Sequence, residues 1–207
     1  MIQLNNLTIG YNGKPIMEGL NYTFENRKIY GILAPSGSGK TTLLRTVAGL
    51  IKPISGSVSI DPGSDLPKDG TAFMMHQKYT NFNWLNLVDN ILIAERDRKL
   101  RNKERTEKAL DILRQVGLYD YRDYYPTQLS GGMNQRLALA RVLYVRPSNI
   151  LMDEPLSALD DDTRKEMQKL ILKMQRETGS TILMVTHSKA EAETMCHHIY
   201  TPQKGGN

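Results

Sequence analysis

The feature that most constrains this chain is a run of small residues at 34–42, which reads Ala-Pro-Ser-Gly-Ser-Gly-Lys-Thr-Thr. The apolar residues 28–34 are typical of a buried strand, and residues 41–50 have the apolar spacing of a helix. Small residues allow several backbone N–H groups to face one anion, and the helix adds the positive end of its dipole at that point. The sequence therefore predicts a phosphate-binding loop between a strand and a helix.

The residue types within this loop indicate a nucleotide. We expect Lys40 to reach the β and γ phosphates and the Thr41 hydroxyl to bind Mg²⁺. The usual pattern begins with Gly, whereas this chain has Ala34; because alanine can turn at negative φ, we expect a small adjustment and retained binding. An incidental Gly/Ser-rich turn leaves the flanking strand and helix unexplained. The candidate nucleotide-binding residues of the loop are Ser36, Gly37, Ser38, Gly39, Lys40, Thr41 and Thr42.

A second candidate site follows the apolar residues 150–152, where Asp153 and Glu154 end a predicted buried strand. Asp153 suits a magnesium partner, directly or through water, and Glu154 can polarise an attacking water. Such a pair alone often only caps the next helix, so its meaning depends on the phosphate loop upstream. The phosphate loop alone leaves kinase, GTPase and transport ATPase chemistry open, and this second site narrows the choice.

The order of predicted elements indicates an α/β chain. A β-rich opening is followed by a strand, loop and helix, then by a helical stretch, and the α/β pattern returns at the end. Strands are predicted at 3–10, 20–25, 28–34, 57–60, 71–75, 149–153 and 181–185, and helices at 41–50, throughout 87–145, at 161–177 and from about 188. We expect a single domain over residues 1–207, with a core at 1–84 and 146–207 and a helical insertion at about 85–145.

Composition narrows the class of protein only in part. The net charge of +5 fits nucleic acid, an anionic membrane surface or an anionic small ligand. The lone cysteine, Cys196, excludes an intrachain disulfide and favours a reducing compartment. No apolar run approaches the ~18 residues of a membrane span, and the first residues lack a secretory pattern. Because the chain ends soon after Ile199, we expect no C-terminal regulatory domain.

The third motif, at residues 129–136, reads Leu-Ser-Gly-Gly-Met-Asn-Gln-Arg and precedes an apolar helix. It resembles the signature motif of ATP-binding cassette (ABC) ATPases, and the resemblance covers essentially the whole chain. The family commonly has Gln where this chain has Met133. This difference affects the fine geometry of the motif more than its identification as a signature motif. The other matching positions, in family order, are Tyr11 for adenine stacking, Gln77 for the Q-loop, residues 157–160 with Asp160 for the D-loop, and His187 for the switch histidine.

The resemblance implies both a fold and a chemistry. The implied fold is α/β, a P-loop NTPase core of the RecA-like type with an N-terminal antiparallel β subdomain and an inserted α-helical subdomain. The implied cofactors are ATP and Mg²⁺, and the implied ligands of the metal ion are Thr41, Gln77 and Asp153. The implied catalytic residues are Glu154, His187 and Lys40. Two copies are implied to pair head to tail, and the residues acting in trans are Ser130, Gly131 and Gly132.

The resemblance also implies partners and a location. Transport requires separate membrane permease subunits, which would contact Gln77 to Leu87 and the helical subdomain, with a solute-binding protein in the complex and no nucleic acid. The chain is then peripheral, on the cytoplasmic face of the cell membrane. Trp84 belongs either to this docking surface or to the core of the helical subdomain. Residues 83–91 are similar to nitrate/sulfonate/taurine-type importer ATPases.

Four functional candidates differ in how well they agree with this sequence. The ATPase subunit of a solute importer agrees with a single compact cassette that has no membrane segment of its own. The alternatives are the ATPase of a separate-subunit exporter and a soluble ABC protein acting on ribosomes or DNA; the soluble members usually carry two cassettes or a long coiled-coil insertion. A small-molecule kinase is disfavoured by the signature at 129–136.

Overall fold

The structure is a computed structural model that describes residues 1–35, 37–61, 72–76, 81–94 and 102–202. The chain divides into two compact units. We call the first the core unit, which comprises residues 1–74, 147–154 and 175–207, and the second the helical unit, which comprises residues 75–146 and 155–174. Ser36 and Gln77, both predicted site residues, lie outside the described residues.

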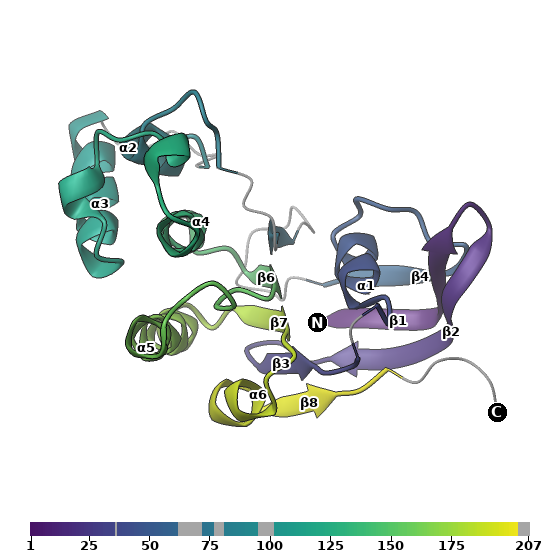
Figure 1. Ribbon diagram of the computed structural model, residues 1–207. Coiled ribbons are helices and arrows are strands. Elements are labelled where there is room, and N and C mark those ends of the chain that lie inside the picture. Colours follow the sequence, from purple (N-terminus) through teal and green to yellow (C-terminus); the bar gives the residue numbers. More distant parts are fainter. Residues whose placement is uncertain (36, 62–71, 77–80, 95–101, 203–207) are drawn as a thin grey trace. The chain divides into compact units, whose positions relative to one another are not determined.

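The core unit begins with a three-stranded antiparallel sheet in the order β2-β1-β4, formed by β1 (Ile2–Tyr11), β2 (Lys14–Phe24) and β4 (Ser55–Ile60) (Figure 1). The turn between β1 and β2 places Asn12 at φ 50° and Gly13 at φ 74°. Two successive positive φ values match the twist of a tight hairpin, which is why Asn-Gly is favoured there. This turn places Tyr11 at the end of its strand.

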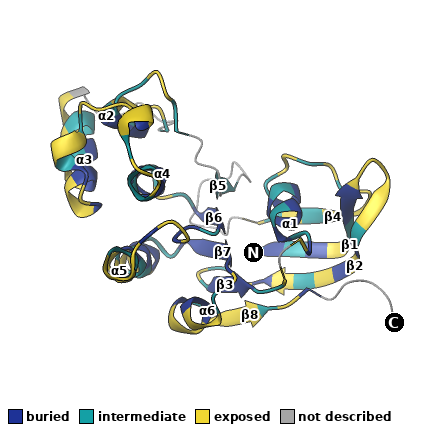
Figure 2. Ribbon diagram, in the orientation of Figure 1, coloured by how far each residue is buried: buried dark blue, intermediate teal, exposed yellow. Residues whose placement is uncertain are grey.

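The second sheet of the core unit has five strands in the order β5-β6-β7-β3-β8. They are β3 (Ile29–Ile32), β5 (Phe73–Met75), β6 (Asn149–Asp153), β7 (Thr181–Val185) and β8 (His198–Tyr200). The pairs β6–β7, β7–β3 and β3–β8 are parallel. Figure 2 shows β3, β6 and β7 buried along their length, as expected of strands at the centre of a parallel sheet.

Two helices of the core unit, α1 (Lys40–Val47) and α6 (Lys189–Met195), each follow a strand of this sheet. Side chains of both sheets and of α1 share one hydrophobic core, whose fully buried members include Ile2, Leu7, Phe24, Ile32, Leu43, Leu44, Leu151 and Leu183. Because strand ends and helix starts are held by this core, the loops between them have a fixed frame.

The helical unit is built from α2 (Leu87–Leu92), α3 (Asn102–Gln115) and α4 (Gly131–Val145), which contact one another in pairs, and it includes the start of α5 (Asp161–Thr178) (Figure 1). Its core is mainly aliphatic, and the fully buried members include Leu87, Ile91, Ala109, Leu113, Val116, Leu137 and Val142. Arg136 on α4 donates to the carbonyls of Val116 and Gly117 at 2.9 and 3.1 Å, which ties α4 to the end of α3.

The expected α/β class is confirmed, with differences in individual elements. The helix predicted throughout 87–145 is wrong over 117–130, where there are only two single 3₁₀ turns, Tyr119–Tyr121 and Pro126–Gln128. The helix α3 ends because Gly117 adopts φ 64° and Leu118 donates back to Leu113, a common helix stop. The strand β8 was not predicted, and β2 is longer than expected. Among the described residues, no helix is both long and apolar enough to cross a membrane.

Candidate nucleotide site and signature segment

The phosphate loop occupies the predicted place, between β3 and α1 in the core unit. Ser38 donates its backbone N–H to Pro35 at 3.2 Å, and α1 begins with the hydrogen bond from Leu43 to the carbonyl of Gly39 at 2.8 Å. Gly37 and Gly39 have φ of 72° and 98°. Backbone in this region is accessible to glycine at little cost, so the loop requires small residues at these two positions.

Gly39 is constrained twice. Its backbone is left-handed, and a Cβ built on it would lie 2.5 Å from Cγ2 of Ile16. An added methyl group would therefore strain the backbone and collide with β2. The glycine allows the start of α1 to pack closely against the neighbouring strand.

Lys40 lies across the loop with its side chain buried. Its ammonium group donates to the carbonyl of Ala34 at 2.6 Å and to that of Pro35 at 2.9 Å. Two residues further along, the Thr42 hydroxyl lies 3.5 Å from the hydroxyl of Tyr11, whose ring is 45% exposed. The structure thus brings the predicted stacking residue beside the phosphate loop.

The acidic pair stands at the end of β6. Asp153 is the last residue of the strand and is 2% exposed. Glu154 follows with φ 50°, an uncommon backbone conformation for a residue with a side chain, and donates its N–H to Val185 at 3.0 Å. Because β6 and β7 are parallel and Asp153 pairs with Val185, the carboxyl ends of both strands meet.

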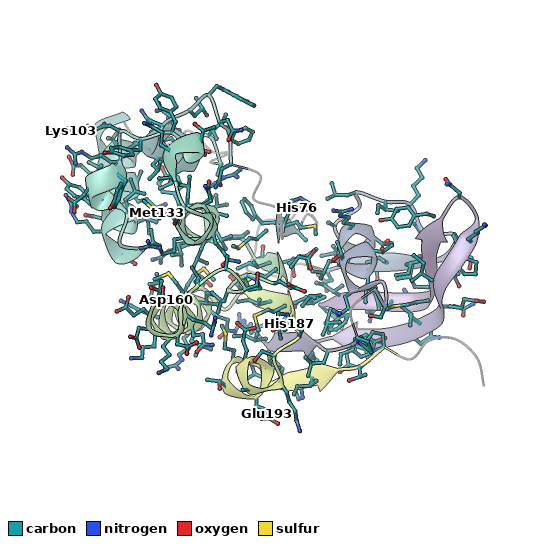
Figure 3. The ribbon with its side chains drawn as sticks, in the orientation of Figure 1. His76, Lys103, Met133, Asp160, His187 and Glu193 are labelled. Carbon is teal, nitrogen blue, oxygen red and sulfur yellow. The ribbon has the colours of Figure 1, made fainter. Side chains whose placement is uncertain are left out.

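His187 follows β7 at that same edge (Figure 3). Its Nδ1 atom lies 3.7 Å from Oε2 of Glu154, and its side chain is 64% exposed. An exposed histidine beside a partly buried carboxylate is free to contact a ligand.

Two residues that sequence reasoning did not assign hold the backbone around His187. Thr186, which is buried, donates its hydroxyl to Oε2 of Glu191 and accepts the N–H of Ser188 at 3.0 Å. Ser188 caps α6 by accepting the N–H of Glu191 at 3.2 Å. The signal for this arrangement was a Ser three residues before a Glu at a helix start, a capping-box pattern.

The signature residues form the N-terminus of α4 in the helical unit. Ser130 caps the helix, with its hydroxyl accepting the N–H of Met133 at 3.2 Å. Figure 3 shows Met133 in the first turn of α4, where its backbone takes part in the cap. The substitution of the family's Gln by Met133 therefore leaves the cap in place.

The D-loop packs on this helix within the same unit. Gln135 accepts the N–H of Ala158 at 2.9 Å, and a Cβ on Gly132 would come within 3.1 Å of the carbonyl of Ala158. Asp160 caps α5 by accepting the N–H of Thr163 at 3.0 Å, and this hydrogen bond lowers the pKa of the Asp160 carboxyl group. The signature segment and the D-loop, which are distant in sequence, thus pack against each other.

Trp84 is 73% exposed, which rules out the alternative that it packs in the core of the helical unit. Its ring forms an edge-type aromatic pair with Phe82, with ring centroids 5.4 Å apart. A large exposed ring in an ordered segment is unusual and indicates a contact surface.

The predicted site residues thus fall into two groups. The core unit holds the loop residues 37–42 together with Tyr11, Asp153, Glu154 and His187, and the helical unit holds residues 130–132 and Asp160. A strand, a glycine loop with a buried lysine, a helix and an acidic strand end define a phosphate-loop nucleotide-binding protein.

The chain belongs to the ABC transporter family, whose model matches residues 17–157. It is similar to the spermidine/putrescine import ATP-binding protein PotA of Mesoplasma florum, with 38% identity over 209 residues that cover 99% of this chain and 59% of PotA. It is also similar to the putative 2-aminoethylphosphonate import ATP-binding protein PhnT of Salmonella paratyphi A, with 41% identity over 203 residues, 96% of this chain and 55% of PhnT. The chain therefore spans a little over half the length of these curated relatives.

Among solved structures, the chain is similar to the dimeric bacterial ABC transporter cassette MJ0796, with a TM-score of 0.86 and 31% identity, covering 98% of this chain and 94% of that one. The same cassette is known as a dimer in a post-hydrolysis state bound to ADP and Pi, and that structure matches equally well, with a TM-score of 0.86. The recognition of the family and of the fold from the sequence is confirmed.

Proposed function

We propose that this protein is the ATP-binding and ATP-hydrolysing subunit of an ABC importer and powers solute uptake through separate membrane subunits. The observation that carries the proposal is the composition of the core unit. In this unit α1 contacts β6, and the same packed body contains the phosphate loop, Asp153, Glu154 and His187. A nucleotide phosphate bound by the loop needs a metal ion and an activated water, and this body has the side chains for both.

The nucleotide would be held by the loop and by Tyr11. The described loop residues 37–42 would supply N–H groups, the Lys40 ammonium group and hydroxyls, and Tyr11 would supply an exposed ring for the adenine. The hydroxyl of Ser38 is buried and has no hydrogen-bond partner among the described residues, which suits a loop that binds an acceptor-rich ligand.

The available oxygen ligands fit Mg²⁺. Thr41 would supply a hydroxyl, Asp153 a carboxylate and Gln77 an amide oxygen, and phosphate oxygens would complete the shell. No cluster of three or more metal-binding side chains occurs in the described part of the chain, and Mg²⁺ with a nucleotide needs only one or two from the protein. The ion would neutralise charge on the phosphates.

For hydrolysis, Glu154 would orient and polarise the attacking water, and His187 would contact the γ-phosphate from the neighbouring strand end. Lys40 would stabilise charge on the transferring group. The 3.7 Å between Glu154 and His187 supports a shared role at one reacting group.

We infer that the second half of the site comes from another copy of the chain. Ser130, Gly131 and Gly132 form a capped helix N-terminus, which is suited to an anion, and Asp160 lies on the D-loop packed against that helix. Head-to-tail pairing would place this segment on the γ-phosphate held by the partner. The dimeric form of MJ0796 supports this arrangement.

The permease subunits would contact residues 77–87, where Trp84 is exposed, together with the helical subdomain. The protein would then be peripheral, on the cytoplasmic face of the membrane, with a solute-binding protein in the complex and no nucleic acid. The domain organisation expected from the sequence, a core at 1–84 and 146–207 with a helical insertion at about 85–145, stays a prediction. The import names of PotA and PhnT support the direction of transport.

The solute is left open. The relatives are named for the import of spermidine/putrescine and of 2-aminoethylphosphonate, which differ in charge. Similarity to these cassettes therefore does not identify the solute. The similarity of residues 83–91 to nitrate/sulfonate/taurine-type importers stays a prediction.

The test is to purify the chain with the membrane protein that co-purifies with it, to identify that protein, and to measure phosphate release with ATP and Mg²⁺. Hydrolysis together with recovery of an importer-type permease supports the proposal. Recovery of an export permease overturns the direction, and recovery of only ribosomal or nucleic-acid partners overturns transport.

A further inference from the structure

The loop that carries Trp84, residues 81–86, is fixed to α2 by one buried side chain. Asn90 on α2 has no exposed surface, and its Oδ1 accepts the N–H of Phe82 at 2.8 Å. Its Nδ2 donates to the carbonyls of Phe82, Leu85 and Asn86 at 3.0, 2.8 and 2.9 Å. A fully buried amide with all these bonds made fixes the loop to α2 as one piece.

The same loop is connected to α4 by a second amide. Asn81 donates through Nδ2 to the backbone carbonyl of Asn134 at 3.0 Å and to its side-chain Oδ1 at 2.9 Å. One residue further on, the Phe82 ring lies under the guanidinium group of Arg141, which is also on α4, with 4.9 Å between them. The loop is therefore attached to the signature helix at two points.

A third amide connects α4 with the segment before it. Asn134 donates through Nδ2 to the carbonyls of Pro126, Leu129 and Ser130, at 3.0, 3.4 and 3.2 Å. Its backbone N–H also bonds to the carbonyl of Ser130 at 2.9 Å. The position of Ser130 is thus set in part by the side chain that Asn81 holds.

We propose that Asn90, Asn81 and Asn134 are positioning residues that form a continuous hydrogen-bonded link between the Trp84 loop and Ser130. The proposal rests on the proposed function, in which a permease contacts Trp84 and Ser130 acts on the partner's nucleotide. Force on the loop then changes the geometry of the signature, and engagement of the signature by nucleotide changes the environment of Trp84, because coupling between two sites is reciprocal.

The first test needs no partner. Asn81→Asp keeps the shape of the side chain but replaces the donating NH₂ with an acceptor that faces two oxygens of Asn134. We expect backbone amide exchange of residues 129–134 to become about tenfold faster, the effect of losing about one to two net hydrogen bonds. Asn83→Ala is the control, because Asn83 is exposed in the same loop. Unchanged exchange in Asn81→Asp overturns the link.

A second variant breaks the link at its other joint. Asn134→Asp keeps an acceptor for Asn81 but removes the donation to residues 126, 129 and 130. Amide exchange of residues 127–134 should increase about tenfold while that of residues 82–90 stays unchanged. This variant also decides the question if Asn81→Asp fails to fold. Equal acceleration in both segments would mean general loosening and would overturn the proposal.

The third test measures coupling through the only tryptophan of the chain. In a Glu154→Gln background with ATP and Mg²⁺, formation of the dimer should shift the emission of Trp84, and Asn81→Asp should remove that shift. An equal shift in both proteins, or no shift in the parent dimer, overturns the link. If no dimer forms, the proposed function fails, and the amide-exchange results still decide the link.

Discussion

Nδ1 of His187 lies 3.7 Å from Oε2 of Glu154, although the two residues follow different strands. The parallel pairing of β6 with β7 brings the two strand ends to one edge and so brings the side chains together. Glu154 is the less exposed of the two, with 21% of its side chain accessible against 64% for His187. The carboxylate is thus positioned by the sheet, while the imidazole remains open to a ligand.

Glu154→Gln should retain nucleotide affinity but lower the rate of ATP hydrolysis by about 10² to 10⁴-fold, because the amide has the size of the carboxylate but does not accept a proton. The dimer should persist with ATP in size-exclusion chromatography. The matched control is Glu193→Gln, an exposed carboxylate on α6 with only a surface ion pair to Lys189. Undiminished phosphate release by Glu154→Gln would exclude this residue as the base.

Gly39→Ala should weaken nucleotide binding and lower the free energy of unfolding by more than the ~1–3 kcal/mol of backbone strain alone, since the new methyl group also meets Ile16. Gly49→Ala isolates the strain, because Gly49 has φ 73° with no atom within 4 Å of an added Cβ. Denaturant titration and nucleotide titration give the two quantities. Equal destabilisation of the two variants would show that the Ile16 side chain moves aside and that its contact with the new methyl group adds no cost.

Glu191→Ala should destabilise the core unit by about 1–3 kcal/mol, because it leaves the buried Thr186 hydroxyl without its acceptor. Glu191→Gln keeps an acceptor oxygen and should recover most of this loss. The hydrolysis rate should fall more in Glu191→Ala than in Glu191→Gln, because Thr186 is the neighbour of His187 and helps to hold its backbone. Urea unfolding and the hydrolysis rate are measured for both variants. A Gln variant as impaired as the Ala variant would show that charge, not hydrogen bonding, matters here.

Trp84→Ala should leave the free energy of unfolding within about 0.5 kcal/mol, because the ring is 73% exposed. Recovery of the membrane partner in co-purification should fall strongly. Leu50→Ala is the control, because Leu50 is 59% exposed on the core unit. If both variants recover the partner equally well, the docking surface lies elsewhere.

Cys196 should react slowly with iodoacetamide. Burial, with a smaller contribution from the charge of Glu191, raises the pKa of its thiol to about 12. Only about one molecule in 10⁴ is then a thiolate at pH 8, and the thiolate is the nucleophile. The rate should rise about tenfold per pH unit from 7 to 9 and be greater in Glu191→Gln, which removes the charge. A rate that levels off near pH 8.5 would indicate an ordinary exposed thiol.

The order of elements and the phosphate loop were predictable because each depends on local pattern. Residues 28–34 and 149–153 contain short apolar runs typical of a buried strand, and the inner strands β3 (Ile29–Ile32) and β6 (Asn149–Asp153) form there. The capped helix at Ser130 likewise follows from a local signal.

Other features depend on tertiary structure. The helical pattern around residue 120 is overridden by the stop at Gly117, and β8 forms only because β3 offers a free edge for His198 to Tyr200. The roles of Asn81, Asn90 and Asn134 were invisible in the sequence, because an asparagine in a loop or helix carries no sign of its hydrogen-bond partners. Ser36 and Gln77 stay predictions, since they lie outside the described residues.

The left-handed backbone of Glu154 has an evolutionary consequence. At φ 50° a glycine would relax the chain, and such a relief is typically worth about 1 kcal/mol or more. The replacement would also delete the carboxylate. Selection for stability alone would therefore favour glycine at this position, whereas the hydrolysis proposed for Glu154 requires its carboxylate.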